Sequence, residues 1–386
     1  MDTLYPKYCK DCRIKLTRNI KSREDVIRCE NCFYQCSRYS YTPLHNFKMP
    51  YWVFGYALEE CVLQYPKVVT AKELQRKLGI AYNSALLLKR RLQLLSGDMI
   101  PLIKDLLTKK LKDEFKDLSL PKESVNVSPL TENKGIVNAD SVVLFSASQR
   151  ANKGRKRFKH TGLTASIYLS EKLGGKQVGT LVHTIALKGG GAIFQPINDQ
   201  TANTLGNQIK EFVPLNAVIF TDEGYPFLKG IYPNHRMVNH NAKSKDSRYR
   251  WARNRWSKDG VNNQVAEGNQ SLLKSAFRSY HYFKPENASF YLDEYSFLSN
   301  VKAYGLAAFA SPLLGEEFKR DLKDGSQIPL SADVGDNVLP RENSLPNNPK
   351  ITTVSKVSKQ FEQSNHGASF ARACRCNHLL KVGFVV

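Results

Sequence analysis

The sequence predicts an α/β protein in which a mixed sheet with flanking helices follows a cysteine-rich module and a helical module. Three observations favour this architecture. Five of the eight cysteines lie within the first 36 residues, helical patterns dominate from Trp52 to Arg91, and strand-like runs alternate with helical ones after Ile136. The 386 residues are enough for two or three domains. We expect boundaries at residues 1–48, 49–120 and 134–310, and a flexible tail at 324–386.

The charge balance favours a polyanionic partner. Lys and Arg number 57 against 35 Asp and Glu, which gives a net charge of +22 and an isoelectric point of about 9.6. Nucleic acid is the commonest partner of such a chain, while an anionic membrane surface or a basic protein without such a ligand are the alternatives. Because no run of about 18 apolar residues and no secretory signal pattern occur, we expect a cytosolic protein without a membrane span.

The cysteine-rich module carries two CxxC pairs, Cys9 with Cys12 and Cys29 with Cys32, separated by sixteen residues. Each pair can present two thiolates from one tight turn, and together the pairs complete a tetrahedral four-sulfur zinc site. A redox pair and unliganded thiols are the alternatives. The interval suits two short strands, so we predict a structural zinc ribbon, with Cys36 either spare or a substitute for Cys32.

The helical module begins with a helical pattern from Trp52 to Gln64. Thr70 and Glu73 then have the spacing of a helix-capping box, and Gly79 suits the turn that ends this second helix. A further helix follows with the basic residues Lys89, Arg90 and Arg91. A short helix, a glycine turn and a basic helix are typical of a DNA-binding helix-turn-helix, although any helical hairpin has the same pattern.

The third module opens with a strand-like run, Ile136 to Leu144, that contains Asp140. Two more strands are expected at 177–187 and 192–197, joined by the glycines at 189–191. A helix at 201–213 follows, and the fourth strand ends on Asp222. This order fits a ribonuclease H-like fold with a mixed sheet. A carboxylate within or at the end of a buried strand favours a bound cation, although a solvent-facing acid is the common alternative.

A third acid, Glu267, lies in a segment that starts as a loop and becomes helical. Lys274 follows seven residues later, which is about two helical turns, so both side chains project from one side of the helix. We expect Val265, Leu272, Leu273, Ala276 and Phe277 to form the buried face. An ordinary helix with a surface Glu and Lys is the alternative.

Together these features resemble the zinc-ribbon DDE transposases of bacterial insertion sequences, the group with an ISXO-like transposase domain. The resemblance runs from about residue 8 to residue 304 and keeps the order of the motifs. One departure is Ser141, which follows Asp140 where the family usually has a second acid. The matching motifs are the two CxxC pairs, Thr70–Arg91, Asp140, Thr221–Tyr225, Val238–His240, Val261–Lys274, Tyr291–Tyr295 and Asn300.

The resemblance implies that Asp140, Asp222 and Glu267 bind two Mg²⁺ (or Mn²⁺) ions, with Lys274 as an associated basic residue and His240 positioning substrate. It implies a DNA transposase whose partners are the double-stranded ends of the mobile element and the target DNA. Bringing two ends together implies a homo-oligomer on DNA, in the cytoplasm and associated with the nucleoid.

Two basic segments of the third module are candidates for phosphate contact. The segment from residue 243 to 258 has seven basic residues and one acid, interspersed with Tyr249, Trp251 and Trp256. A solvated charged loop with tryptophans in the core is the alternative. The other segment runs from residue 150 to residue 160 and contains no acid. The candidate DNA-binding residues of the two segments are Arg155, Lys156, Arg157, Lys159, Arg250, Arg253 and Arg255.

Two other functions fit the same motifs. A non-catalytic DNA-binding regulator would keep the cysteine and helix-turn-helix modules without needing the three acids, and a nuclease of the same fold would cut strands without joining them. The sequence assigns no role to Cys36, nor to Cys374 and Cys376 with the neighbouring His378.

Overall fold

The computed structural model describes residues 4–121, 123–147, 167–169, 174–306 and 308–309. The described residues divide into two compact units, with the division between Thr42 and Pro43. The predicted tail at 324–386 lies outside the described residues. The helical segment predicted at 49–120 shares the second unit with the sheet, and the predicted domain boundaries stay predictions.

The first unit contains a three-stranded antiparallel sheet of β1 (Arg18–Ile20), β2 (Arg23–Arg28) and β3 (Gln35–Ser37). As expected, two of these strands, β1 and β2, lie between the two CxxC pairs. The apolar core beneath them is small: Leu16 and Ile27 are buried together with two cysteines. So little buried apolar surface leaves the unit dependent on another source of folding free energy.

The second unit begins with α1 (Tyr51–Gln64), α2 (Ala71–Leu78) and α3 (Tyr82–Glu114). The predicted helix signals are confirmed at α2. The Thr70 hydroxyl accepts a hydrogen bond from the backbone N–H of Glu73 at 3.2 Å, and Gly79 ends the helix with a φ of 65°. The helix expected after Gly79 is a single helix of 33 residues, longer than its basic stretch.

Lys89 is not a DNA-surface residue, and the prediction for it is wrong. Its side chain is 4% exposed and its ammonium forms an ion pair with Glu294 of α8 (Ala288–Tyr304). Gln93 donates a second hydrogen bond to that carboxylate at 3.2 Å. The Glu294 charge raises the pKa of Lys89 despite its burial. Because the ammonium is enclosed between two helices, it cannot reach a phosphate.

The sheet of the second unit has five strands in the order β6-β5-β4-β7-β8. Strands β4, β5 and β6 are antiparallel neighbours, whereas β4, β7 and β8 run parallel. A mixed sheet was therefore predicted correctly. The five strands are β4 (Val137–Leu144), β5 (Thr180–Leu187), β6 (Ala192–Ile197), β7 (Ile219–Thr221) and β8 (His235–Met237).

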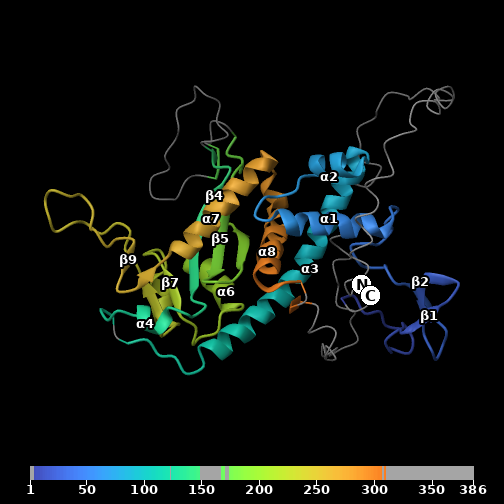
Figure 1. The fold of residues 1–386 in the computed structure, drawn as a ribbon, viewed down its shortest axis with the longest axis horizontal. Coiled ribbons are helices and arrows are strands. Elements are labelled where there is room, and N and C mark those ends of the chain that lie inside the picture. The colour runs from blue at the N-terminus through green and yellow to red at the C-terminus, as the bar shows by residue number, and fades with distance from the viewer. Residues whose placement is uncertain (1–3, 122, 148–166, 170–173, 307, 310–386) are drawn as a thin grey trace. The chain divides into compact units, whose positions relative to one another are not determined.

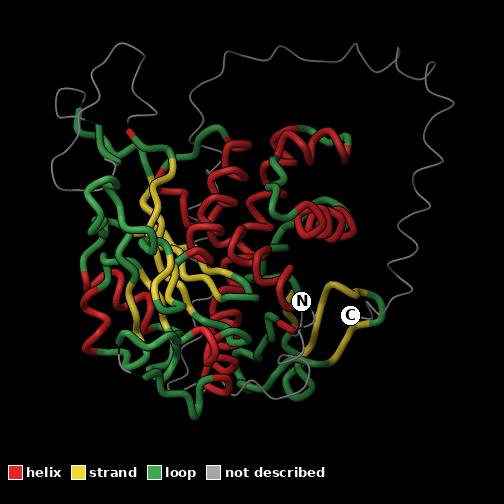
Figure 2. The backbone as a smooth tube through the Cα atoms, turned by 60° about the vertical axis from the view of Figure 1, so that its left-hand side comes forward, coloured by secondary structure: helices red, strands yellow, loops and turns green. Residues whose placement is uncertain are grey.

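Helices pack against the strands of the sheet (Figures 1 and 2). Helix α6 (Ala202–Lys210) connects β6 to β7, and α7 (Gln264–Phe277) follows the strands in sequence. The short elements are α4 (Ser128–Thr131), β9 (Ser257–Lys258), β10 (Val261–Asn262) and the 3-10 turns η2 (Pro226–Gly230), η3 (Arg278–Tyr280) and η4 (Pro285–Asn287).

Strand β5 is buried along its whole length because both faces of the sheet are covered. On one face, Val182 packs with Leu273 of α7 and Tyr295 of α8. On the other, His183 is hydrogen-bonded to Gln208 of α6 at 2.8 Å. Consecutive residues of a strand point to opposite faces, which explains why Val182 and His183 contact different helices.

The buried face of α7 differs from the prediction at one position. Leu273, Ala276 and Phe277 are buried as expected, but Leu272 is 45% exposed. The buried polar residue Gln270 lies on this face instead. Within the described part of the chain, no helix is both long enough and apolar enough to cross a membrane.

We predict that Lys89→Met lowers the free energy of unfolding by about 3–5 kcal/mol, because it leaves the Glu294 carboxylate buried without its cation. Equilibrium urea unfolding measures this change. The matched control is Lys77→Met, which removes ion pairs with Glu60 and Glu73 at a partly exposed site and should cost about 1 kcal/mol or less. Equal losses in the two variants would contradict the buried-pair interpretation.

Candidate functional site

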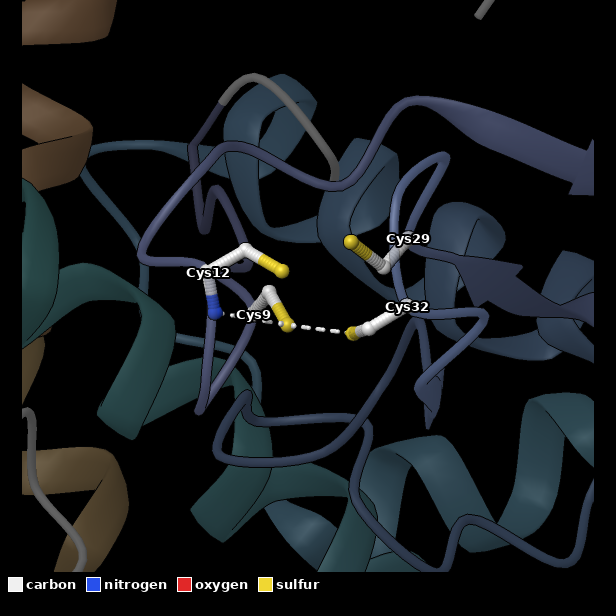
Figure 3. Close-up of side chains that lie close together, drawn as sticks. All are labelled: Cys9, Cys12, Cys29 and Cys32. Atoms are coloured by element: carbon white, nitrogen blue, oxygen red, sulfur yellow. Dashed lines mark hydrogen bonds between the residues drawn. The ribbon is translucent and has the colours of Figure 1, made fainter.

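Four cysteines of the first unit converge on one point (Figure 3). The Sγ atoms of Cys9, Cys12, Cys29 and Cys32 all lie within 4.8 Å of one another, and none of the four forms a disulfide. The backbone N–H of Cys12 points to the Cys9 sulfur at 3.4 Å. Tetrahedral zinc with four sulfur ligands at about 2.3 Å would separate the sulfurs by about 3.8 Å. The cluster therefore fits a zinc ion.

The two CxxC turns have the same local conformation. The residue after each pair, Arg13 in the first and Phe33 in the second, has a left-handed φ of 59° and 60°, respectively. Such a turn folds the chain back so that both cysteines of a pair face inward. Cys36, although close to this core, lies on β3 outside the four-sulfur group.

The pKa values of two of these thiols, Cys29 and Cys12, are also perturbed. Backbone N–H groups of Cys32 and Asn31 lower the pKa of Cys29 to about 7. Hydrogen bonding with Cys32 raises the pKa of Cys12 to about 12. Neighbouring thiolates thus repel further ionisation, and a divalent cation would hold all four deprotonated.

In the second unit, strand register brings two of the predicted acids together. Strands β4 and β7 are parallel neighbours in which Ala139 pairs with Thr221. Asp140 is the next residue of β4, and Asp222 directly follows the last residue of β7. The pairing therefore brings the two acids close together, and the Asp222 charge raises the pKa of Asp140.

The third acid approaches from α7. Helix α7 packs on β4 and β5, and Glu267 lies in its first turn. The Oε1 atom of Glu267 is 3.6 Å from Nε2 of His240, which follows β8. Asn263, just before the helix, donates a hydrogen bond to the Ala139 carbonyl at 3.4 Å. The start of α7 is thus tied to the strand that carries Asp140.

Asp140 has a strongly perturbed pKa. Burial raises its pKa to about 7, and the neighbouring charges of Asp222 and Glu267 raise it further, against a stabilising hydrogen bond from the Ser141 backbone N–H. The three carboxylates are therefore close enough to repel one another. Among the described residues, their oxygens do not converge as tightly as the four sulfurs.

Residues 130–300 match the family model of the ISXO2-like transposase domain. This segment is therefore similar to ISXO2-like transposase domains, and we refer to it as the transposase domain. It contains Asp140, Asp222 and Glu267, and it begins after α3. Comparisons with curated proteins and with solved structures give no match.

The transposase domain surrounds the acids with polar residues that the sequence reasoning did not single out. Gln270, one turn after Glu267, is buried near Asp140, and its side-chain amide lowers the pKa of that carboxyl. The hydroxyls of Ser141 and Tyr225 are hydrogen-bonded at 3.2 Å on the opposite face. Helical spacing from Glu267 could have identified Gln270, whereas the Ser141–Tyr225 pair depends on tertiary contact.

The predicted basic residues of the transposase domain have different placements. Lys274, Arg250 and Arg253 are exposed, and Arg255 is half-buried against tryptophan rings. The other basic segment, with Arg155, Lys156, Arg157 and Lys159, lies outside the described residues.

Two further predicted DNA-binding residues lie before the transposase domain and have partners within α3's own unit. Arg91 donates hydrogen bonds to the carbonyls of Pro43 and His45 at 2.6 and 2.7 Å. Arg90 lies 4.3 Å above the ring of Phe290. Both are half-buried, and their contact with DNA stays a prediction.

We predict one zinc ion per chain, lost on substitution of Cys9→Ser because three thiolates bind zinc less tightly than four. Elemental analysis of the purified protein measures the metal, and protease digestion measures unfolding of the first 42 residues. Cys36→Ser is the matched control and should keep its zinc, since Cys36 lies outside the four-sulfur group. A Cys9→Ser protein with full zinc content would contradict this assignment.

Proposed function

We propose that this chain is a DNA transposase that cleaves and joins DNA strands using divalent metal ions held by Asp140, Asp222 and Glu267. The observation that carries the proposal is that Asp140 and Asp222 each directly follow the paired residues Ala139 and Thr221 of parallel strands, within a segment that matches a transposase family. Glu267 is close enough to influence the pKa of Asp140.

The strand order supports a ribonuclease H-like fold for this domain. Counted from β4, the sheet has the order 3-2-1-4-5, with three antiparallel strands followed by two parallel ones. One helix connects the third strand to the fourth, as the sequence pattern predicted. Asp140 then lies on the first strand, Asp222 directly after the fourth strand, and Glu267 on the helix that follows the sheet.

The donor set suits Mg²⁺ or Mn²⁺, which prefer oxygen ligands. Bound divalent ions would supply activation of water or a DNA 3′-hydroxyl and stabilisation of the leaving oxygen. The chain's own contribution is to hold three carboxylates in one place. Gln270 supports Asp140, and His240 lies where it can orient Glu267 or donate to a phosphate oxygen.

Phosphate contacts would come from the exposed basic residues around this site. Arg250, Arg253 and Arg255 belong to a loop with seven cations and one acid, and Lys274 is exposed on the helix of Glu267. Lys and Arg side chains neutralise the DNA backbone and release counterions. The net charge of +22 supports the same partner.

The two preceding modules would add DNA contacts without chemistry. A four-cysteine zinc site has no open ligand position, so its role is structural. The α2–Gly79–α3 arrangement supports a helix-turn-helix. With Lys89 buried, the exposed start of α3, including Asn83, is the part available to DNA. We further propose at least a homodimer on DNA and a nucleoid-associated, cytoplasmic location, since two DNA ends must be joined.

We predict that Asp222→Asn lowers Mg²⁺-dependent cleavage and strand transfer by more than about 100-fold, because an amide is a poorer ligand than a carboxylate. The assay uses duplexes that carry the DNA flanking each end of the coding sequence. The matched control is Glu223→Gln, an exposed neighbouring acid, which should keep activity. Full activity of Asp222→Asn would overturn the assignment; wild-type binding without cleavage would favour a regulator, and cleavage without transfer a nuclease.

We predict that replacing Arg250, Arg253 and Arg255 with Ala reduces the slope of log affinity against log salt by about 2 to 3, since each lost phosphate contact removes about 0.9. Fluorescence anisotropy of a labelled duplex between low and moderate salt measures the slope. A triple variant of exposed lysines outside the loop, Lys109, Lys116 and Lys302, removes the same charge. If both triple variants change the slope equally, the loop has no special contact with DNA.

A further inference from the structure

We propose that Trp256 forms a stacking site for one unpaired nucleobase of the DNA, next to the three acids. The inference rests on the proposed function, because it takes DNA as the ligand. It adds the state of that DNA: the nucleotide beside the phosphate held at the acids would have its base turned out of the double helix and placed against the indole.

The position of Trp256 follows from its neighbours. The His240 and Trp256 rings are 4.7 Å apart between centroids. Nε2 of the same histidine lies 3.6 Å from Oε1 of Glu267. A single imidazole therefore separates the indole from a proposed metal ligand. A base on Trp256 would belong to a nucleotide that adjoins the phosphate at the acids.

The backbone fixes the indole at this position. The chain leaves the sheet at Val238, whose N–H is hydrogen-bonded to the Thr221 carbonyl at 3.0 Å, beside Asp222. Figure 1 shows the following loop extending away from the sheet before β9. Directly after Trp256, β9 pairs with β10, and α7 with Glu267 begins two residues later. The hairpin therefore links the indole to the helix of the third acid.

Trp256 is available to a ligand. It is 45% exposed, although tryptophan is the side chain with most to gain from burial. Its His240 and Arg255 neighbours leave this part of the indole in solvent. An exposed aromatic ring beside a proposed metal site is the kind of surface on which nucleobases stack.

Cations surround the aromatic rings of this loop. The Arg255 guanidinium lies 4.7 Å from the Trp256 ring centroid and 5.1 Å from that of Trp251. Lys243 lies 3.9 Å from the Trp251 centroid. The acid of the loop, Asp246, is paired with Arg248 at 2.8 Å. Rings interspersed with cations suit a strand that presents both bases and phosphates.

An intact duplex does not offer a base face to the indole, because each base is covered by its neighbours. A base reaches such a ring at an end, in a single strand, or after being turned out, at a cost of a few kcal/mol. The structure therefore favours an unpaired base over a groove contact. Stacking would then fix the adjoining phosphate at the acids.

The test uses the protein's own fluorescence. The chain has three tryptophans, Trp52, Trp251 and Trp256, so a W52F/W251F protein reports on Trp256 alone. We expect its emission to be quenched at saturation by single-stranded dT12. A 12-base-pair duplex with both ends closed by linkers should quench it much less. The matched control, W52F/W256F, reports on Trp251 and should distinguish the two DNAs less.

Saturation is judged by anisotropy of labelled DNA, so binding and stacking are read separately. We expect W256A to weaken dT12 binding by about 10-fold and W256F to weaken it less. Y249A, which removes an exposed ring from the far part of the loop, should have a smaller effect. Equal quenching of Trp256 by both DNAs, no quenching at saturation, or no binding of either DNA overturns the proposal.

The same proteins separate this inference from the proposed function. Adding Asp222→Asn to the W52F/W251F protein should abolish cleavage and leave the quenching by dT12 intact, since Asp222 does not touch the indole. Quenching without cleavage by the parent protein contradicts the catalytic proposal and supports the stacking site. Cleavage with unchanged Trp256 emission contradicts the stacking site alone.

Discussion

The transposase domain depends on the parallel pairing of β4 with β7. That pairing brings Asp140 of β4 close to Asp222, the residue that follows β7, so two carboxylates lie near each other. Burial and this proximity raise the pKa of Asp140 to about 7. Such repulsion costs folding free energy, which the apolar contacts of β5 and α7 must offset. The domain therefore keeps a site that is unfavourable for its own stability and favourable for a cation.

A second constraint is the buried Lys89–Glu294 ion pair, which holds two of the helices around the sheet together. A buried ion pair requires both partners to be in place, because either charge alone would be costly. The pair joins α3 to α8, and α8 covers β6 through contacts such as Ser296 Oγ with the Phe194 backbone N–H at 2.9 Å. The position of α3 is therefore fixed relative to the sheet, and Lys89 becomes a packing residue.

The two candidate metal sites differ in their ligand atoms and in the packing around them. The cysteines form a closed four-sulfur cluster in a unit with little apolar core, which suits a structural metal. The carboxylates lie in a well-packed domain and offer oxygen ligands, which leaves positions for water and phosphate. Close to the carboxylates, His240 and Trp256 add a polar and an aromatic surface. With metal bound, one site would stabilise a fold, and the other would handle a substrate.

The sequence by itself determined the local features: the four cysteines at their spacing, the Thr70 cap and Gly79 turn, and the strand and helix order of the sheet domain. These depend on residues near one another in the chain. Tertiary structure decided the rest. Lys89 looked like a surface cation until α8 supplied Glu294, and Leu272 looked buried by helical spacing although Gln270 faces Asp140 instead. Burial and partners more than 200 residues away, as for Lys89 and Glu294, cannot be inferred from local pattern, because they depend on which helix packs against which.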